Sequence, residues 1–166
     1  MTREVGSALS PALVERLSQR ELPKRLGVGL PFVTLDAGGH SHPMLVSYLE
    51  LRAYDAGSLG LVIRADSGSA RNLAERAVGT LSIIEPGTVT YVKIRALDGP
   101  LPVVGGEKYG LGFFLLEVVQ VLEDAAGEWE GGARITGAIR YEPAPTLDEP
   151  WARATLAALA APRARA

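Results

Sequence analysis

The feature that most constrains the fold is a series of short, β-rich segments separated by turn signals, running from Leu30 to Arg95. The clearest turn is Glu85-Pro86-Gly87-Thr88, which separates the apolar segments Thr80–Ile84 and Val89–Ala96. In this turn proline presets the first central position and glycine accepts a positive φ at the second. Short strands at regular spacing, joined by such turns, favour an antiparallel barrel over a parallel sheet.

The same local signals predict the remaining strands and loops. The segment Pro31–Leu35 ends at the turn Asp36-Ala37-Gly38-Gly39. Further strands are predicted at Pro43–Leu51, Leu59–Ala65, Phe113–Glu123 and Ala133–Glu142. The glycine-rich stretch Asp98–Gly112 is predicted to be a loop.

Three helices are predicted from capping residues. Ser10 and Pro11 suit the start of an N-terminal helix over residues 10–21. A short helix is expected over 67–77, between the third and fourth strands, with Ser67 or Ser69 as its N-cap. Thr146-Leu147-Asp148-Glu149 has the pattern of a capping box, which predicts a C-terminal helix over 147–160.

Composition narrows the class of protein. The chain has 166 residues, of which 47% are hydrophobic, so we expect a single domain over 1–166 with a conventional core. The absence of cysteine excludes thiolate metal sites, cysteine nucleophiles and disulfides. A net charge of -2 gives no reason to expect nucleic acid as a partner. No apolar run approaches the roughly 20 residues of a membrane span, and no signal-peptide pattern is present, so a cytoplasmic location is expected.

Four stretches, taken in order, resemble the pyridoxamine 5'-phosphate oxidase-like split barrels, a family that commonly binds FMN at a homodimer interface. They correspond to the opening strand and turn, the second strand, the loop-to-helix segment ending in Asn-Leu, and the strand after it, at 32–39, 42–48, 67–73 and 79–84. The resemblance implies a mainly β (α+β) fold, an antiparallel split barrel of about six or seven strands. The barrel would span roughly residues 30–142, with a short helix between strands three and four and helices at both ends.

The resemblance also implies a function and a cofactor site. The chain would be a homodimer that binds FMN and acts as a flavin-dependent oxidoreductase on an unknown small molecule. A phosphate dianion is bound by helix N-terminal amides, hydroxyls and cations. In the family's pattern Ser67 falls on a phosphate-binding serine, whereas Met44 and Ser69 stand where cations are usual. Arg64 and Arg71 could substitute for those cations.

The implied cofactor-binding set therefore has two parts. One part would surround the phosphate, at Arg64, Ala65, Ser67, Ser69, Arg71 and Asn72. The other would place main chain beside the isoalloxazine ring, at Met44, Leu45, Val46 and Ser47.

Other functions remain open on the same sequence. The missing cations at Met44 and Ser69 are also compatible with a split barrel that has lost FMN and serves as a ligand-binding or sensing module. A haem-binding or haem-degrading split barrel would use His40 or His42 as axial ligand. These two histidines lack an obvious third ligand, so no metal site is predicted. Catalytic residues are not predicted either.

One strand carries a pair of cations. Lys93 and Arg95 share a face with Tyr91, because side chains on a strand alternate with a period of two. Such a face is either solvated or binds an anionic ligand.

Overall fold

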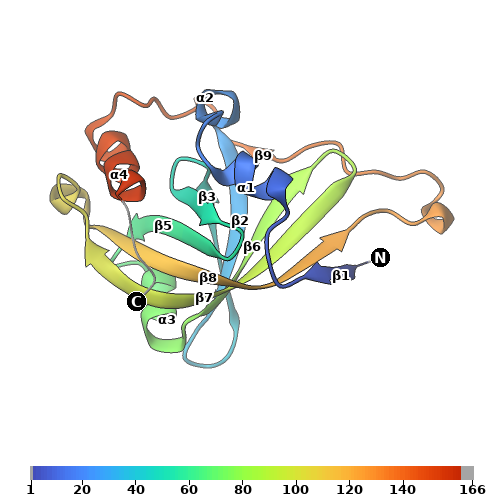
Figure 1. Cartoon of the computed structure of the whole chain (residues 1–166), viewed down its shortest axis with the longest axis horizontal. Helices are drawn as coiled ribbons and strands as arrows, with labels where there is room; N and C mark the ends of the chain where they lie inside the picture. Colours follow the sequence, from blue (N-terminus) through green and yellow to red (C-terminus); the bar gives the residue numbers. More distant parts are fainter. Residues whose placement is uncertain (1, 162–166) are drawn as a thin grey trace.

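The fold is a curled antiparallel sheet with helices packed around it (Figure 1). The computed structural model describes residues 2–161, apart from the side chain of Glu128. The strands are β1 Arg3–Gly6, β2 Val28–Leu35, β3 Ser41–Ser47, β4 Leu51–Asp55, β5 Ser58–Arg64, β6 Val78–Glu85, β7 Thr88–Pro102, β8 Leu111–Asp124 and β9 Ile139–Arg140. The helices are α1 Pro11–Leu17, α2 Leu22–Arg25, α3 Gly68–Arg76 and α4 Pro150–Ala160, with 3-10 turns η1 Glu107–Tyr109 and η2 Glu128–Glu130.

The sheet has the open order of a split barrel. Its strands follow the order β3-β2-β6-β7-β8-β5-β4, with β1 paired to β8 and β9 paired to β2. The predicted mainly β split barrel, with a short helix between the third and fourth predicted strands, is confirmed. Of the described residues, none belongs to a helix long and apolar enough to cross a membrane.

Alternation along the strands divides the sheet into two faces. The inward face carries the main core, which includes Phe32 of β2, Leu61 of β5 and Ile94 of β7. On the outward face α4 covers β5 and the first half of β8, where Leu159 and Phe113 join a second apolar cluster. The outward face of β2, β6 and β7 lies beyond α4, and it is there that a ligand could reach the sheet.

Several local predictions are confirmed. The turn at 85–88 joins β6 to β7, and Gly87 takes a φ of +87°. Ser10 caps α1, with its Oγ accepting a hydrogen bond from the amide of Leu13. Ser67, and not Ser69, caps α3.

The N-terminal helix does not extend over 10–21, because α1 ends at Leu17. Gln19 takes a φ of +68° and turns its side chain into the sheet. There its Nε2 donates to the carbonyls of Leu49 and Leu51, at 3.1 and 3.2 Å. The chain resumes as the short helix α2, so the predicted single helix is wrong.

The predicted second strand, Pro43–Leu51, is broken into β3 and β4 by a turn at Ser47–Glu50. The amide of Glu50 donates to the carbonyl of Ser47 at 3.0 Å. The Glu50 carboxylate accepts in return from the amide and the hydroxyl of Ser47. This turn contains neither glycine nor proline, so no local turn signal predicts it.

Two further predictions are wrong in the second half of the chain. The stretch Asp98–Gly112 is not all loop, because β7 continues to Pro102 and pairs with β8, and register shifts around Gly99 absorb the irregular residues. The predicted strand Ala133–Glu142 is reduced to β9. On the edge of β2 away from β3, β6 pairs with Phe32–Thr34, and β9 pairs with Val28 and Gly29.

The ends of the chain also differ from prediction. The strand β1 lies outside the predicted barrel range of 30–142. The capping box at 146–149 does not form, since α4 starts at Pro150 with Glu149 in extended conformation as its N-cap. Proline disfavours the helical conformation of the residue before it, which explains the later start.

Candidate functional site

The start of α3, where the resemblance implies a phosphate site, is fixed by buried polar contacts to the sheet. The Oγ of Ser67 accepts a hydrogen bond from the amide of Ala70 at 3.1 Å. Asn72 donates from Nδ2 to Oγ1 of Thr34 at 3.0 Å, and that hydroxyl donates to the carbonyl of His42 at 3.4 Å. These contacts hold α3 against β2 and β3.

The imidazole of His42 lies against the first residue of α3. A Cβ built on Gly68 would come within 2.8 Å of His42 Nε2. Glycine at this position therefore lets the histidine approach the helix closely. His40, by contrast, is exposed beside Asp36, with its Nδ1 3.5 Å from the carboxylate.

The six residues predicted around the phosphate do not present one common surface. Ser69 and Asn72 are only 1% and 6% exposed, so their side chains face the interior. Arg71 is exposed on α3, and Ala65 is exposed after β5. The phosphate-binding role of these residues stays a prediction.

Arg64 is held by a neighbouring acid. Its guanidinium donates two hydrogen bonds to the carboxylate of Asp66, at 2.9 and 2.6 Å. This bidentate contact lowers the pKa of Asp66 and raises that of Arg64. A phosphate binding to Arg64 would have to compete with a carboxylate already in place.

The predicted ring-binding stretch on β3 alternates between the two faces of the sheet. Val46 and Ser47 are buried, Met44 is half-buried against the core, and Leu45 is exposed on the outward face. The side chains of Ser47 and Glu50 are joined by a hydrogen bond, and Glu50 lines the same cavity as Arg64 and Asp66.

An outward-facing groove on the sheet is a second candidate site. This outer-face groove has a volume of about 360 Å³. Its residues come from β2, β3, β6, β7 and β8: Val33, Leu35, Ser41, Val78, Gly79, Thr80, Lys93, Ile94, Arg95 and Val119. Strand pairing explains the grouping, since Thr80 lies opposite Val33 and Lys93, and Val78 lies opposite Arg95.

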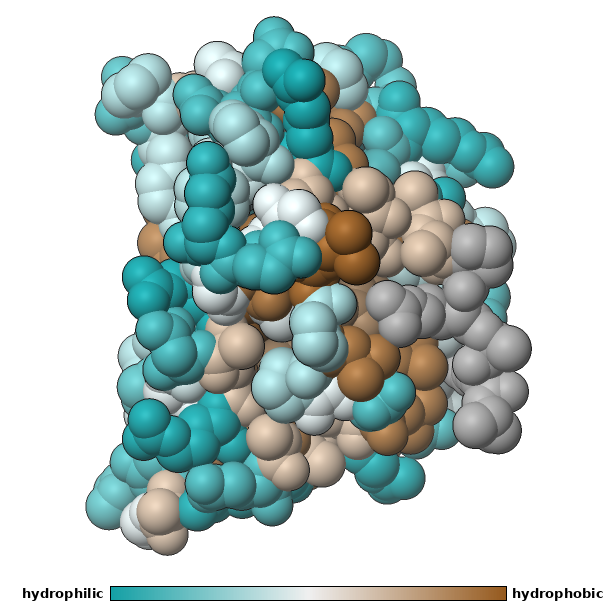
Figure 2. Space-filling view, turned by 90° about the vertical axis from the view of Figure 1, so that its left-hand side faces the viewer, coloured by the Kyte–Doolittle hydropathy of each residue, from teal (hydrophilic) through white to brown (hydrophobic). Residues whose placement is uncertain are grey.

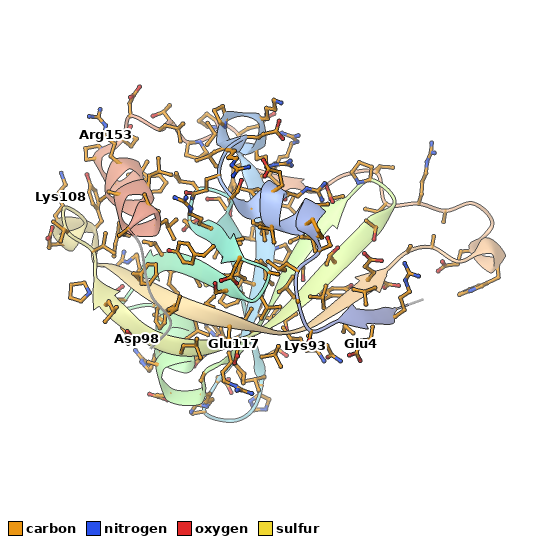
Figure 3. All side chains as sticks on the ribbon, viewed as in Figure 1. Glu4, Lys93, Asp98, Lys108, Glu117 and Arg153 are labelled. Carbon is orange, nitrogen blue, oxygen red and sulfur yellow. The ribbon has the colours of Figure 1, made fainter. Side chains whose placement is uncertain are left out.

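The outer-face groove combines cations with an apolar floor. Lys93 and Arg95 are exposed side chains, and Arg95 reaches Glu117 at 3.4 Å, a distance that leaves it only loosely held. Leu35, Val78 and Val119 expose apolar surface nearby. Figure 3 shows Lys93 and Glu117 on the same side of β7 and β8. Chemically, this surface can bind a ligand that has an anionic group and a flat apolar part.

The sequence predicted part of this groove. The shared face of Tyr91, Lys93 and Arg95 is confirmed, because these residues pair in register with Ser82, Thr80 and Val78 of β6. The floor from β2 and β8 was missed, since it depends on which strands become neighbours. Within the described part of the chain, no group of three or more histidine or acidic side chains could hold a metal ion.

Comparison with known proteins identifies the fold. No family model and no curated protein matches the sequence. An FMN-binding protein from Syntrophomonas wolfei subsp. wolfei is similar in structure, with a TM-score of 0.52 and 10% identity over 70% of this chain and 89% of that one. A candidate pyridoxamine 5'-phosphate oxidase from Lactobacillus delbrueckii has a TM-score of 0.55 and 13% identity, over 72% and 98% of the two chains.

A third solved structure points the same way. HupZ from Group A Streptococcus has a TM-score of 0.50 and 10% identity, over 68% of this chain and 92% of that one. At such identities structural likeness establishes the fold and not the activity. This chain therefore has the split-barrel fold of the pyridoxamine 5'-phosphate oxidase-like FMN-binding proteins.

Proposed function

We propose that this chain is a binding protein for a planar, anionic ligand, with FMN as the leading candidate, and that the ligand occupies the outer-face groove. The observation that carries the proposal is the pair of exposed cations, Lys93 and Arg95, beside an apolar floor. The structural likeness to an FMN-binding protein supports the choice of FMN over other anions.

The groove offers matching chemistry for both parts of FMN. Lys93 and Arg95, with the hydroxyls of Ser41 and Thr80, are suited to the phosphate, because charge-assisted hydrogen bonds are the strongest that a protein can offer it. Val33, Leu35, Val78 and Val119 provide apolar surface for the ring, at about 25 cal/mol for each Å² removed from water. Bound flavin supplies redox chemistry, whereas the protein supplies position and electrostatics.

The same face supports the proposed homodimer. Leu35, Leu45, Val78 and Val119 are exposed on it, and Arg95 lies beside Glu117. A second copy related by a two-fold axis can pack along the rim of this face and close the groove over a bound ligand. Sedimentation equilibrium tests this: wild type should sediment as a dimer and Val119→Asp as a monomer. A monomeric wild type contradicts the dimer.

A second candidate function is a split barrel without flavin. It is favoured by the buried side chains of Ser69 and Asn72 and by the Arg64–Asp66 pair, because these leave fewer side chains free to contact a phosphate. In that case the outer-face groove would bind another planar anion. Both functions use Lys93 and Arg95, so the identity of the ligand decides between them.

The absorption spectrum of the purified protein, followed by titration with FMN, tests the choice of ligand. Flavin bands, or saturable quenching of FMN fluorescence, support an FMN-binding protein. A colourless protein that leaves FMN fluorescence unchanged excludes FMN and leaves the second function.

A further inference from the structure

A second cavity lies at a different place on the molecule, between the start of α4 and the segment that links β7 to β8. This Glu50 cavity has a volume of about 600 Å³ and is lined by Glu50, Arg64, Asp66, Lys108, Tyr109, Gly110, Leu111 and Trp151. Figure 2 shows the side of the molecule on which α4 and this linking segment lie, where apolar surface is bordered by hydrophilic residues. The cavity shares no lining residue with the outer-face groove.

Glu50 is one of the two acids that line this cavity. Its Oε2 accepts hydrogen bonds from the amide and the hydroxyl of Ser47, at 2.7 and 2.8 Å. Among the described residues no hydrogen bond reaches its Oε1. Burial raises the pKa of this carboxyl. Burial also raises the pKa of Tyr141, and the charge of Glu50 adds to that effect. A half-buried carboxylate with one oxygen free of hydrogen bonds favours a cationic hydrogen-bond donor as its ligand.

The other charges of the cavity leave one cation unmatched. Arg64 and Asp66 neutralise each other through their two hydrogen bonds. Lys108 is exposed, and its Nζ lies 4.7 Å from the ring centre of Tyr109. The N-terminus of α4 adds a partial positive charge close to Trp151, because no side chain caps it. The cavity thus has an acidic site at Glu50 and a basic site formed by Lys108 and the start of α4.

We propose that the Glu50 cavity binds a small zwitterion, an α-amino acid with an apolar side chain. The ammonium group contacts Oε1 of Glu50, and the carboxylate lies toward Lys108 and the start of α4. The rings of Tyr109 and Trp151, with Leu111, contact the apolar side chain. A simple anion would meet Glu50 and Asp66, and a simple cation would meet Arg64 and Lys108, so a ligand with both charges fits better.

The fluorescence of Trp151 gives a direct test, because it lines the cavity. The chain has two tryptophans, and Trp129 is 82% exposed, so Trp129→Phe leaves Trp151 as the only reporter at little cost in stability. The Trp129→Phe protein is titrated with L-phenylalanine, N-acetyl-L-phenylalanine and L-phenylalaninamide. L-Phenylalanine is expected to change the emission of Trp151 saturably, and each derivative should bind about tenfold more weakly, since each lacks one charged contact.

Substitutions of Glu50 and Lys108 show which residue contacts the ammonium group of the ligand and which contacts its carboxylate. Glu50→Gln in the Trp129→Phe background should weaken L-phenylalanine about tenfold and leave the N-acetyl derivative unaffected. Lys108→Gln should weaken L-phenylalanine and spare the amide. Lys93→Ala with Arg95→Ala is the control at the outer-face groove, and it should leave amino-acid binding unchanged whether or not FMN binds there.

The proposal is overturned if neither L-phenylalanine nor L-leucine changes the emission of Trp151 at concentrations up to about 10 mM, the range of weak binding. It is also overturned if the derivatives bind as well as the parent amino acid. Thermal unfolding of each variant confirms that the protein compared is folded.

Discussion

Asn72 of α3 donates a hydrogen bond from Nδ2 to Oγ1 of Thr34 on β2, at 3.0 Å, and both side chains are buried. This contact joins two segments that are far apart in the sequence and fixes the short helix beneath the sheet. It also explains why an Asn-Leu pair ends the segment: Asn72 bonds to the sheet, while Leu73 belongs to the core.

Replacing Asn72 tests this role. We expect Asn72→Ala to lower the free energy of unfolding by about 1–3 kcal/mol, because a buried hydroxyl loses its partner. Urea denaturation measures the change. Arg71→Ala on the same helix is the control, since Arg71 is exposed and its loss should cost less than about 0.5 kcal/mol. Equal effects of the two substitutions would contradict a structural role for Asn72.

Substitutions of Ser67 distinguish a helix-capping role of this residue from a contact with the ligand. Ser67→Ala should lose about 1 kcal/mol of stability, because the amide of Ala70 loses its acceptor. Ser67→Asp should retain stability, since aspartate also caps helices well. If Ser67 acts only as the cap, both variants bind FMN as wild type does. A tenfold loss of FMN affinity in Ser67→Ala, with normal stability, would point to a phosphate contact instead.

The raised pKa of Glu50 predicts that the free energy of unfolding depends on pH. Burial raises its pKa in the folded protein. Between the ordinary glutamate pKa of about 4.3 and this raised value, the folded protein keeps a proton that the unfolded chain has released, so stability falls as pH rises. Glu50→Gln removes this fall. The free energy of unfolding of Glu50→Gln, relative to that of wild type, should therefore increase as the pH rises from about 4 toward neutrality. Parallel pH curves for the two proteins would show that Glu50 titrates normally.

Gly60 makes room for α4. A Cβ at this position would lie 2.5 Å from the hydroxyl of Tyr54 on β4, 2.9 Å from Leu159 of α4 and 2.9 Å from Phe113 of β8. Gly60→Ala is therefore expected to destabilise the protein by about 1–3 kcal/mol through overpacking. Gly137→Ala is the control, because a Cβ there meets nothing within 4 Å. Thermal unfolding that ranks the two variants equally would mean that α4 does not pack tightly on β5.

How far the sequence predicts this structure depends on how local each signal is. The turn at 85–88 and the start of α3 were predicted, because Gly87 and Ser67 act within a few residues of themselves. The turn at Ser47–Glu50 was not predicted, because it is stabilised by the side chain of Glu50, which accepts a hydrogen bond from the hydroxyl of Ser47. The extension of β7 was missed as well, because pairing with β8 outweighs the local effect of Gly99.

For the candidate site, too, the sequence predicts what depends on local signals and not what depends on tertiary packing. Alternation along one strand was enough to place Lys93 and Arg95 on one face. The burial of Ser69 was not visible in the sequence, since it depends on how α3 rotates against the sheet. Glu50 could have been noticed as a single acid between Leu49 and Leu51, a position where a charge is costly.

We propose that the outer-face groove, and not the start of α3, binds the anionic ligand. The measurement that tests it most directly is FMN affinity, by fluorescence titration, in two matched double variants that each remove two cations. Lys93→Ala with Arg95→Ala should weaken FMN binding at least tenfold, because two charge-assisted contacts are lost, and Arg64→Ala with Arg71→Ala should leave it within about twofold. The opposite ranking, with affinity lost only in the Arg64 and Arg71 pair, would contradict this account and restore the phosphate to the start of α3.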